Sequence, residues 1–140
     1  MSVEIYFFFW HINNMRKEKQ LKIILKYNPC PDEYHTWIRT VNDIKTLAEA
    51  LLDDDCAGYD TFDPDYTRAD VERALKTGQI VVYSSHPITQ GVFVTPSKME
   101  ATDYTADGNV YSKLVNIDDV AWIDVTQGQY ANISLEEKEN

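Results

Sequence analysis

Residues 91–104, G-V-F-V-T-P-S-K-M-E-A-T-D-Y, combine apolar, hydroxyl and acidic side chains in an order that suits a ligand site. The apolar start is typical of a β-strand, and Thr95 and Ser97 follow where a helix would begin. A strand-to-helix junction gathers hydroxyls and unpaired backbone amides, which suits a ligand with ribose or phosphate oxygens. Ser and Thr are also ordinary helix caps, so a purely structural interpretation stays open.

Two further clusters of polar and aromatic residues are candidates for the same site. The first is centred on His35 and Thr36, and the second is the sequence Y-S-S-H at 83–86. Each also has an ordinary explanation, a surface or half-buried histidine in the first and a strand end before Pro87 in the second. Trp122 lies in an apolar run typical of a buried strand, and we predict that it belongs to the core.

Signatures of several other enzyme classes are missing from the sequence. It contains no G-x-S-x-G elbow, no G-x-x-x-x-G-K-[ST] loop and no H-E-x-x-H helix, which disfavours the corresponding hydrolases, ATPases and zinc enzymes. Cys30 and Cys56 lack the spacing of a zinc site or a redox pair. We therefore expect reduced thiols and no bound metal.

The order of these motifs resembles the ADP-ribosyltransferase fold, in the branch that includes poly(ADP-ribose) polymerases and diphtheria-type toxins. In that branch a first strand carries His, Gly and Thr. A second strand, Gly-aliphatic-aromatic-aromatic, leads into a helix that ends with a small residue and Tyr, and a late strand supplies a catalytic Glu. Here G-V-F-V at 91–94 is similar to the second strand, with Ala101 and Tyr104 at the helix positions.

The other two motifs depart from the pattern of this family. Y-H-T at 34–36 is similar to the first motif without its Gly, and G-Q-Y at 128–130 is similar to the late strand with Gln129 in place of Glu. The resemblance covers roughly a third of the chain. It extends to short domains of this fold in phage and mobile-element proteins, which implies a bacterial host cell.

The resemblance implies an NAD site. His35 would hydrogen-bond a ribose, and Phe93 and Tyr104 would flank the nicotinamide. Gln129 would contact the nicotinamide ribose, but a neutral amide stabilises the developing positive charge poorly, and losing one such group costs roughly 100- to 1000-fold in rate. Transfer is thus expected to be weak or absent, unless a carboxylate such as Asp124 takes the role. The residues assigned to cofactor binding are His35, Thr36, Tyr83, Ser84, Phe93, Thr95, Ser97 and Tyr104, and those assigned to catalysis are Gln129 and His35.

The elements that must position these residues predict an α+β fold, with a small, mainly antiparallel sheet and two to three helices. Strands are predicted at 20–27, 80–84, 91–94, 110–115, 120–125 and 129–133. Helices are predicted at 41–52, from 67 to a stop at Gly78, and from Pro96 as first helical residue to Tyr104, with Ser97 and Glu100 as a capping pair.

The length of 140 residues and the hydrophobic share of 44% predict one domain, at 15–133. Residues 1–14 are expected to be an extension or edge strand before a natural start at Met15, and residues 134–140 a frayed, charged tail. The apolar residues 3–12 are too short for a membrane span and lack the features of a secretory signal. We therefore expect a cytoplasmic protein with no membrane partner.

The formal net charge of -10 disfavours direct binding of nucleic acid. It also leaves a competing hypothesis open. A non-enzymatic acidic inhibitor, of the anti-CRISPR or another anti-defence type, would occupy a basic host protein that itself binds nucleic acid.

Overall fold

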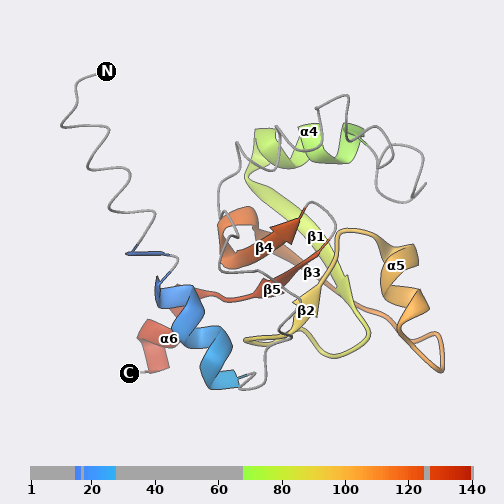
Figure 1. The fold of residues 1–140 in the computed structure, drawn as a ribbon. Helices are drawn as coiled ribbons and strands as arrows, with labels where there is room; N and C mark the ends of the chain where they lie inside the picture. The colour runs from blue at the N-terminus through green and yellow to red at the C-terminus, as the bar shows by residue number, and fades with distance from the viewer. Residues whose placement is uncertain (1–14, 17, 28–67, 125–126, 140) are drawn as a thin grey trace.

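The computed structural model describes residues 15–16, 18–27, 68–124 and 127–139 (Figure 1). The predictions for residues 1–14, for His35 and Thr36, for both cysteines and for the helix at 41–52 lie outside this range. The described residues form helices and antiparallel strands, which confirms the α+β class. Besides a helical segment within 15–27, the elements are α4 (Arg68–Thr77), β1 (Gln79–Ser84), β2 (Phe93–Val94), α5 (Lys98–Asp103), β3 (Tyr111–Asn116), a 3-10 turn (Ile117–Asp119), β4 (Val120–Asp124), β5 (Gln127–Tyr130) and α6 (Ile133–Glu139).

The strands form two hydrogen-bonded groups that meet at a single bridge. β1 pairs with β3, while β5 lies between β2 and β4, and all of these pairs are antiparallel. At the bridge, Tyr83 N donates to Thr95 O at 2.7 Å and Thr95 N donates to Tyr83 O at 3.0 Å. The end of β1 therefore lies beside the end of β2, and two of the predicted site segments, 83–86 and 91–104, are brought to one place.

Local sequence signals explain several of these elements. The alternation along β1 buries Ile80 and Val82 against the core and leaves Val81 exposed, as expected for a strand with one covered face. α4 ends before Gly78, whose φ of +76° is the left-handed conformation that glycine adopts readily, and Gly78 N donates to Ala74 O at 2.7 Å. The predicted helix stop at this glycine is confirmed.

Two hydrophobic clusters lie on opposite faces of β4 and β5. Trp122 belongs to the larger cluster, is only 3% exposed, and donates from Nε1 to Ile117 O at 3.0 Å, which confirms its predicted place in the core. Its neighbour Ala121 points to the other face, where it packs with Ile23 and Ile24 of the N-terminal helical segment. This helical segment therefore covers the second face of the sheet.

The strand predicted at 20–27 was wrong, because these residues are helical. A short aliphatic run fits a strand or a buried helix turn equally well, and here the buried residues Gln20, Ile23 and Ile24 have the spacing of one helix face. Gln20 Nε2 donates to Asp118 O and to Ala131 O, both at 2.9 Å. Contacts made with the far end of the chain thus select the helix.

The C-terminal residues also differ from their prediction. β5 ends at Tyr130, before the predicted boundary, and α6 occupies most of the tail that was expected to fray. Asn132 Oδ1 accepts from Leu135 N at 3.2 Å at the start of α6. Ion pairs from Lys19 to Glu137 and from Lys26 to Glu136 then connect α6 to the N-terminal helical segment. No helix among the described residues is long and apolar enough to cross a membrane.

The contact between these two helices predicts a pH effect. A hydrogen bond from Lys26 lowers the pKa of Glu136 below its ordinary value of 4.5. A lowered carboxyl pKa contributes stability that is present above the ordinary value and is lost as the pH falls through the folded value. The variant Glu136→Gln should therefore show a smaller fall in melting temperature between about pH 5 and pH 3. Glu137→Gln, which keeps the Lys26 pair, is the control, and equal acid sensitivity in wild type and both variants would contradict this assignment.

Candidate functional site

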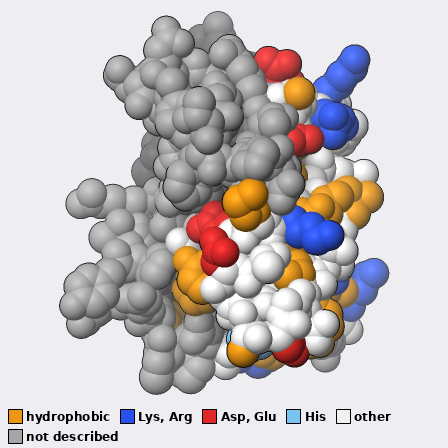
Figure 2. Space-filling view, turned by 90° about the vertical axis from the view of Figure 1, so that its right-hand side faces the viewer, with side chains coloured by type: hydrophobic (Ala, Val, Ile, Leu, Met, Phe, Trp, Pro, Cys, Tyr) orange, Lys and Arg blue, Asp and Glu red, His pale blue; other side chains and the backbone are white. Residues whose placement is uncertain are grey.

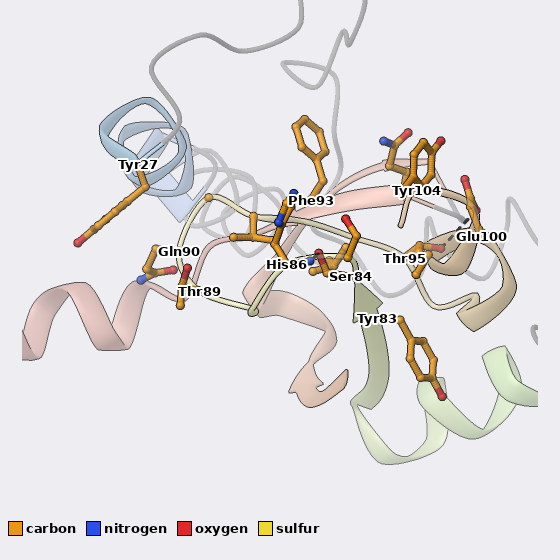
Figure 3. Close-up of a pocket in the computed structure, with 16 residues that line it drawn as sticks. Tyr27, Tyr83, Ser84, His86, Thr89, Gln90, Phe93, Thr95, Glu100 and Tyr104 are labelled. Atoms are coloured by element: carbon orange, nitrogen blue, oxygen red, sulfur yellow. Dashed lines mark hydrogen bonds between the residues drawn. The ribbon is translucent and has the colours of Figure 1, made fainter. Parts of the chain in front are cut away.

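A cavity with a volume of about 870 Å³ lies beside the meeting point of β1 and β2 (Figure 3). Its volume is within the range of roughly 300 to 1,000 Å³ found for small-molecule sites. Among the described residues, the wall is formed by the end of β1, the loop that follows it, β2 and α5 with its C-cap, with one residue each from the N-terminal helical segment and β5. Five of the six described residues assigned to cofactor binding line it, and these are Tyr83, Ser84, Phe93, Thr95 and Tyr104.

Aromatic side chains contribute much of the wall. Phe93 rises from β2, and Tyr104 lies at the C-terminal end of α5 (Figure 3). Tyr104 is 69% exposed, which is unusual for a large aromatic residue. Tyr83, in contrast, extends its ring toward α4 and also lines a smaller hollow there.

The junction between β2 and α5 is held by its own hydroxyl groups. Ser97 is the helix N-cap and accepts from Glu100 N at 2.9 Å, so the predicted capping pair is confirmed. Pro96 precedes this cap, and its predicted place as first helical residue was therefore wrong. Thr95 Oγ1 accepts from Ser97 N at 3.1 Å and donates to Glu100 Oε2 at 3.3 Å.

These contacts separate the roles of the two hydroxyl residues. Ser97 has no exposed surface and is not part of the cavity wall. In this structure its hydroxyl caps α5, which is the structural alternative to ligand binding. Thr95 is 6% exposed and does line the cavity. Its hydroxyl holds the carboxylate of Glu100 in place at the cavity wall.

The side chain of Gln90 fixes the loop between β1 and β2, because it hydrogen-bonds both backbone groups of Asn132 as a neighbouring strand would. Gln90 Nε2 donates to Asn132 O at 2.7 Å, and its Oε1 accepts from Asn132 N at 2.8 Å. Gly91 N donates to Tyr130 O at 2.7 Å immediately beyond. Within the same loop, His86 N donates to Ser84 Oγ at 3.2 Å. These bonds hold Ser84 and His86 at one side of the cavity.

Gln129, assigned to catalysis, is fully buried and does not line the cavity. It pairs with Phe93 across the strands, and its Nε2 donates to Gly91 O at 3.1 Å. Its Oε1 has no hydrogen-bond partner among the described residues. Gln127, two residues earlier on β5, lines the cavity instead. The catalytic assignment of Gln129 stays a prediction. In this structure its side chain is buried where a ligand in the cavity would not contact it.

Sequence reasoning missed several lining residues. They come from the N-terminal helical segment, the loop before β2, α5 and β5, and they are Tyr27, Thr89, Gln90, Glu100 and Gln127. Glu100 had been recognised only as a capping residue. Tyr27 could not be found because its segment was assigned to a strand. The meeting of His35 with Phe93 and Gln129 stays a prediction, because His35 lies outside the described residues.

Charges are sparse and of one sign in the described wall of the cavity. Glu100 is its carboxylate, and no Lys or Arg is among the lining residues that the structure describes. On the molecular face drawn in Figure 2, described Asp and Glu side chains are interspersed with Lys, Arg and hydrophobic ones. In the described part of the chain, no group of three or more His, Cys, Asp or Glu could hold a metal ion.

Asp119 has a perturbed pKa but lies away from this cavity, at the 3-10 turn before β4. Burial raises its pKa, and the opposing charge of Arg16 offsets only part of that effect. Arg16 also donates to the Asp118 carbonyl oxygen and, at 3.3 Å, to Asp119 Oδ1. These contacts attach the N-terminal helical segment to the sheet, and the burial of Asp119 beside them explains the raised pKa without a catalytic role. Comparisons of the chain with family models, with curated proteins and with solved structures gave no match.

Proposed function

We propose that this chain is an ADP-ribosyltransferase-like binding module that holds NAD or a related nucleotide, by its nicotinamide end, in the cavity beside β2. One observation carries the proposal. Side chains assigned to cofactor binding from two separate stretches of sequence, 83–86 and 91–104, line a single cavity of about 870 Å³, a volume suited to part of a dinucleotide.

The composition of the cavity wall also supports binding of a flat aromatic ligand. Phe93 and the exposed ring of Tyr104 offer faces for stacking, while Ser84 and His86 offer hydrogen-bonding groups nearby. A mostly apolar wall with a few polar groups is typical of sites that orient small molecules. The absence of cationic side chains from the described wall favours the nicotinamide end over the pyrophosphate.

The contacts of Gln129 favour binding of NAD without transfer of its ADP-ribose. Gln129 is neutral and buried beneath Gly91, so it supplies no negative charge to a ribose in the cavity. Without a well-placed anion, cleavage of the nicotinamide bond loses a large part of its electrostatic stabilisation. We therefore expect no measurable release of nicotinamide from NAD.

NAD should raise the melting temperature of the full chain. A ligand at 100 times its Kd adds about 2.7 kcal/mol to the free energy of unfolding, enough for a shift of several degrees. Tyr104→Ala should weaken binding by about 5- to 150-fold, because one stacked base contributes roughly 1 to 3 kcal/mol. The change should hardly affect the fold, since Tyr104 is 69% exposed.

Tyr111→Ala provides the matched control for this experiment. Tyr111 is 46% exposed on β3 and does not line the cavity, so its loss should leave the NAD effect unchanged. A flat melting temperature with NAD, or equal effects of the two substitutions, would exclude the proposed site. Capture of a basic host protein that weakens steeply with added salt would then favour the acidic inhibitor instead.

A further inference from the structure

Ion pairs attach the N-terminal helical segment to α6, beside which it lies (Figure 1). Lys19 Nζ lies 3.3 Å from Glu137 Oε1, and Lys26 Nζ lies 2.7 Å from Glu136 Oε1. These four side chains are between 19% and 63% exposed. Dissolved salt can therefore screen the attraction between them.

The apolar contact beneath the segment is small. Ile23 and Ile24 pack with Ala121 and Ala131, and Ile133 is partly buried beside them. Burial stabilises a contact in proportion to the apolar area removed from water, and an alanine side chain offers little of it. Attachment of the segment therefore depends on its polar contacts as well.

One buried group opposes the attachment. Gln129 is the cross-strand partner of Ala121, so its side chain lies on the face of the sheet that the segment covers. Its Nε2 donates to Gly91 O, but its Oε1 is buried without a hydrogen-bond partner among the described residues. A buried acceptor without a partner destabilises the closed arrangement, because water would satisfy it once the segment moved away.

Tyr27 connects the attachment to the cavity. It is the last residue of the helical segment and lines the cavity beside β2 (Figure 3). Its Oη donates at 3.2 Å to Glu136 Oε2, on the carboxylate that also accepts from Lys26. Separation of the segment from α6 would therefore also remove a residue from the cavity wall.

We propose that the N-terminal helical segment is a releasable cover, held closed by its ion pairs with α6 and opened by ionic strength while the strands stay folded. Release exposes Gln129 and withdraws Tyr27 from the cavity wall. Release itself does not depend on what the cavity binds. Its coupling to the cavity rests on the proposed function, since NAD bound against the complete wall should hold the cover closed.

The test is proton exchange of the side-chain amides of Gln20 and Gln129, measured by NMR on the full chain. Both side chains are buried, and Gln20 Nε2 donates to Asp118 O and Ala131 O, so each should exchange only when the segment leaves. Raising NaCl from about 20 to about 500 mM should speed both exchanges by about ten-fold. The backbone amide of Val82, in the core, should keep its rate. Protection factors equal to that of Val82 at every salt concentration would overturn the proposal, because the segment would then open only with the whole fold.

Charge reversal tests the ion pairs directly. Glu136→Lys brings two cations together and should speed both exchanges by about ten-fold at low salt. Adding Lys26→Glu should restore the wild-type rate, because the pair is then present with its charges exchanged.

Asp103→Lys is the matched control. It changes the net charge by the same amount, but Asp103 is the exposed last residue of α5 and forms no ion pair within the described part of the chain. Both exchanges should keep their wild-type rates in this variant. Equal acceleration by Asp103→Lys and Glu136→Lys, or no restoration in the double variant, would overturn the role of the ion pairs.

A last comparison adds saturating NAD to the wild-type chain at low salt. Exchange of both side-chain amides should slow by about five-fold or more. Unchanged exchange, in a chain whose melting temperature NAD raises, would overturn the coupling between cover and cavity. A melting temperature that NAD does not raise would remove the proposed function instead, and the salt series and charge reversal would still decide whether the segment is released.

Discussion

Gln129→Glu is expected to destabilise the fold and not to create transfer activity. The side chain of Gln129 has no exposed surface, and its Nε2 donates to Gly91 O at 3.1 Å. A glutamate there would replace this donor with a second acceptor and would bury an unpaired charge. The free energy of unfolding should fall by about 3 to 5 kcal/mol at neutral pH, as measured by urea denaturation.

The pH dependence of this variant gives an independent check. Burial would raise the pKa of the introduced carboxyl, so the folded chain would favour its protonated form. Stability should then be highest below the ordinary carboxyl pKa and be lost as the pH rises through the raised value. Gln129→Met, which keeps a similar shape without a charge but also removes the donor to Gly91 O, should cost about 1 to 3 kcal/mol, and this cost should not depend on pH. A Gln129→Glu variant that is as stable as wild type and releases nicotinamide would contradict the structural role and support the catalytic one.

Gly128→Ala should also destabilise the fold strongly, by about 1 to 3 kcal/mol or more. A Cβ at this position would lie 2.5 Å from Val120 Cγ1, closer than real contacts allow, and 3.0 Å from Ala121 O, which is tighter than most real contacts. Because the second contact is with backbone, β4 and β5 would have to separate. The measurement is the free energy of unfolding, with Gly108→Ala as a comparison, since nothing lies within 4 Å of a Cβ there and only its φ of +78° opposes the change.

A double-mutant cycle would show whether the Val120 contact is the cause. Val120→Ala removes the closest atom, so the cost of Gly128→Ala should be smaller in that background than in the wild type. Equal costs in both backgrounds would attribute the effect to the backbone contact alone. Because β5 also carries Gln127 into the cavity, Gly128→Ala should weaken NAD binding as well.

Much of the fold follows from signals that act over a few residues. The stop of α4 at Gly78, the alternation of β1 and the cap of α5 by Ser97 depend on φ preference, strand period and local hydrogen bonds. Each of these is present in the sequence before any tertiary contact forms. This is why the α+β class and most strand positions between 79 and 124 were predictable.

The tertiary structure decided the points at which these local signals were ambiguous. The aliphatic run at 20–27 could form a strand or a helix, and bonds from Gln20 to carbonyls about a hundred residues away favoured the helix. Gln127 and Gln129 point to the same face of β5, so strand period cannot tell which of them meets a ligand. Beside Gln129, the N-terminal helical segment packs on Ala121 and Ala131.

For the candidate site, the sequence by itself determined the residue types: a hydroxyl-rich junction, aromatic rings at Phe93 and Tyr104, and a neutral Gln129. Only the tertiary structure decided that β1 meets β2 through Tyr83 and Thr95, that Gln129 is buried, and that Glu100 belongs to the cavity wall. The physical reason is that side-chain chemistry is a local property of the chain. Exposure and proximity instead depend on how distant segments pack together.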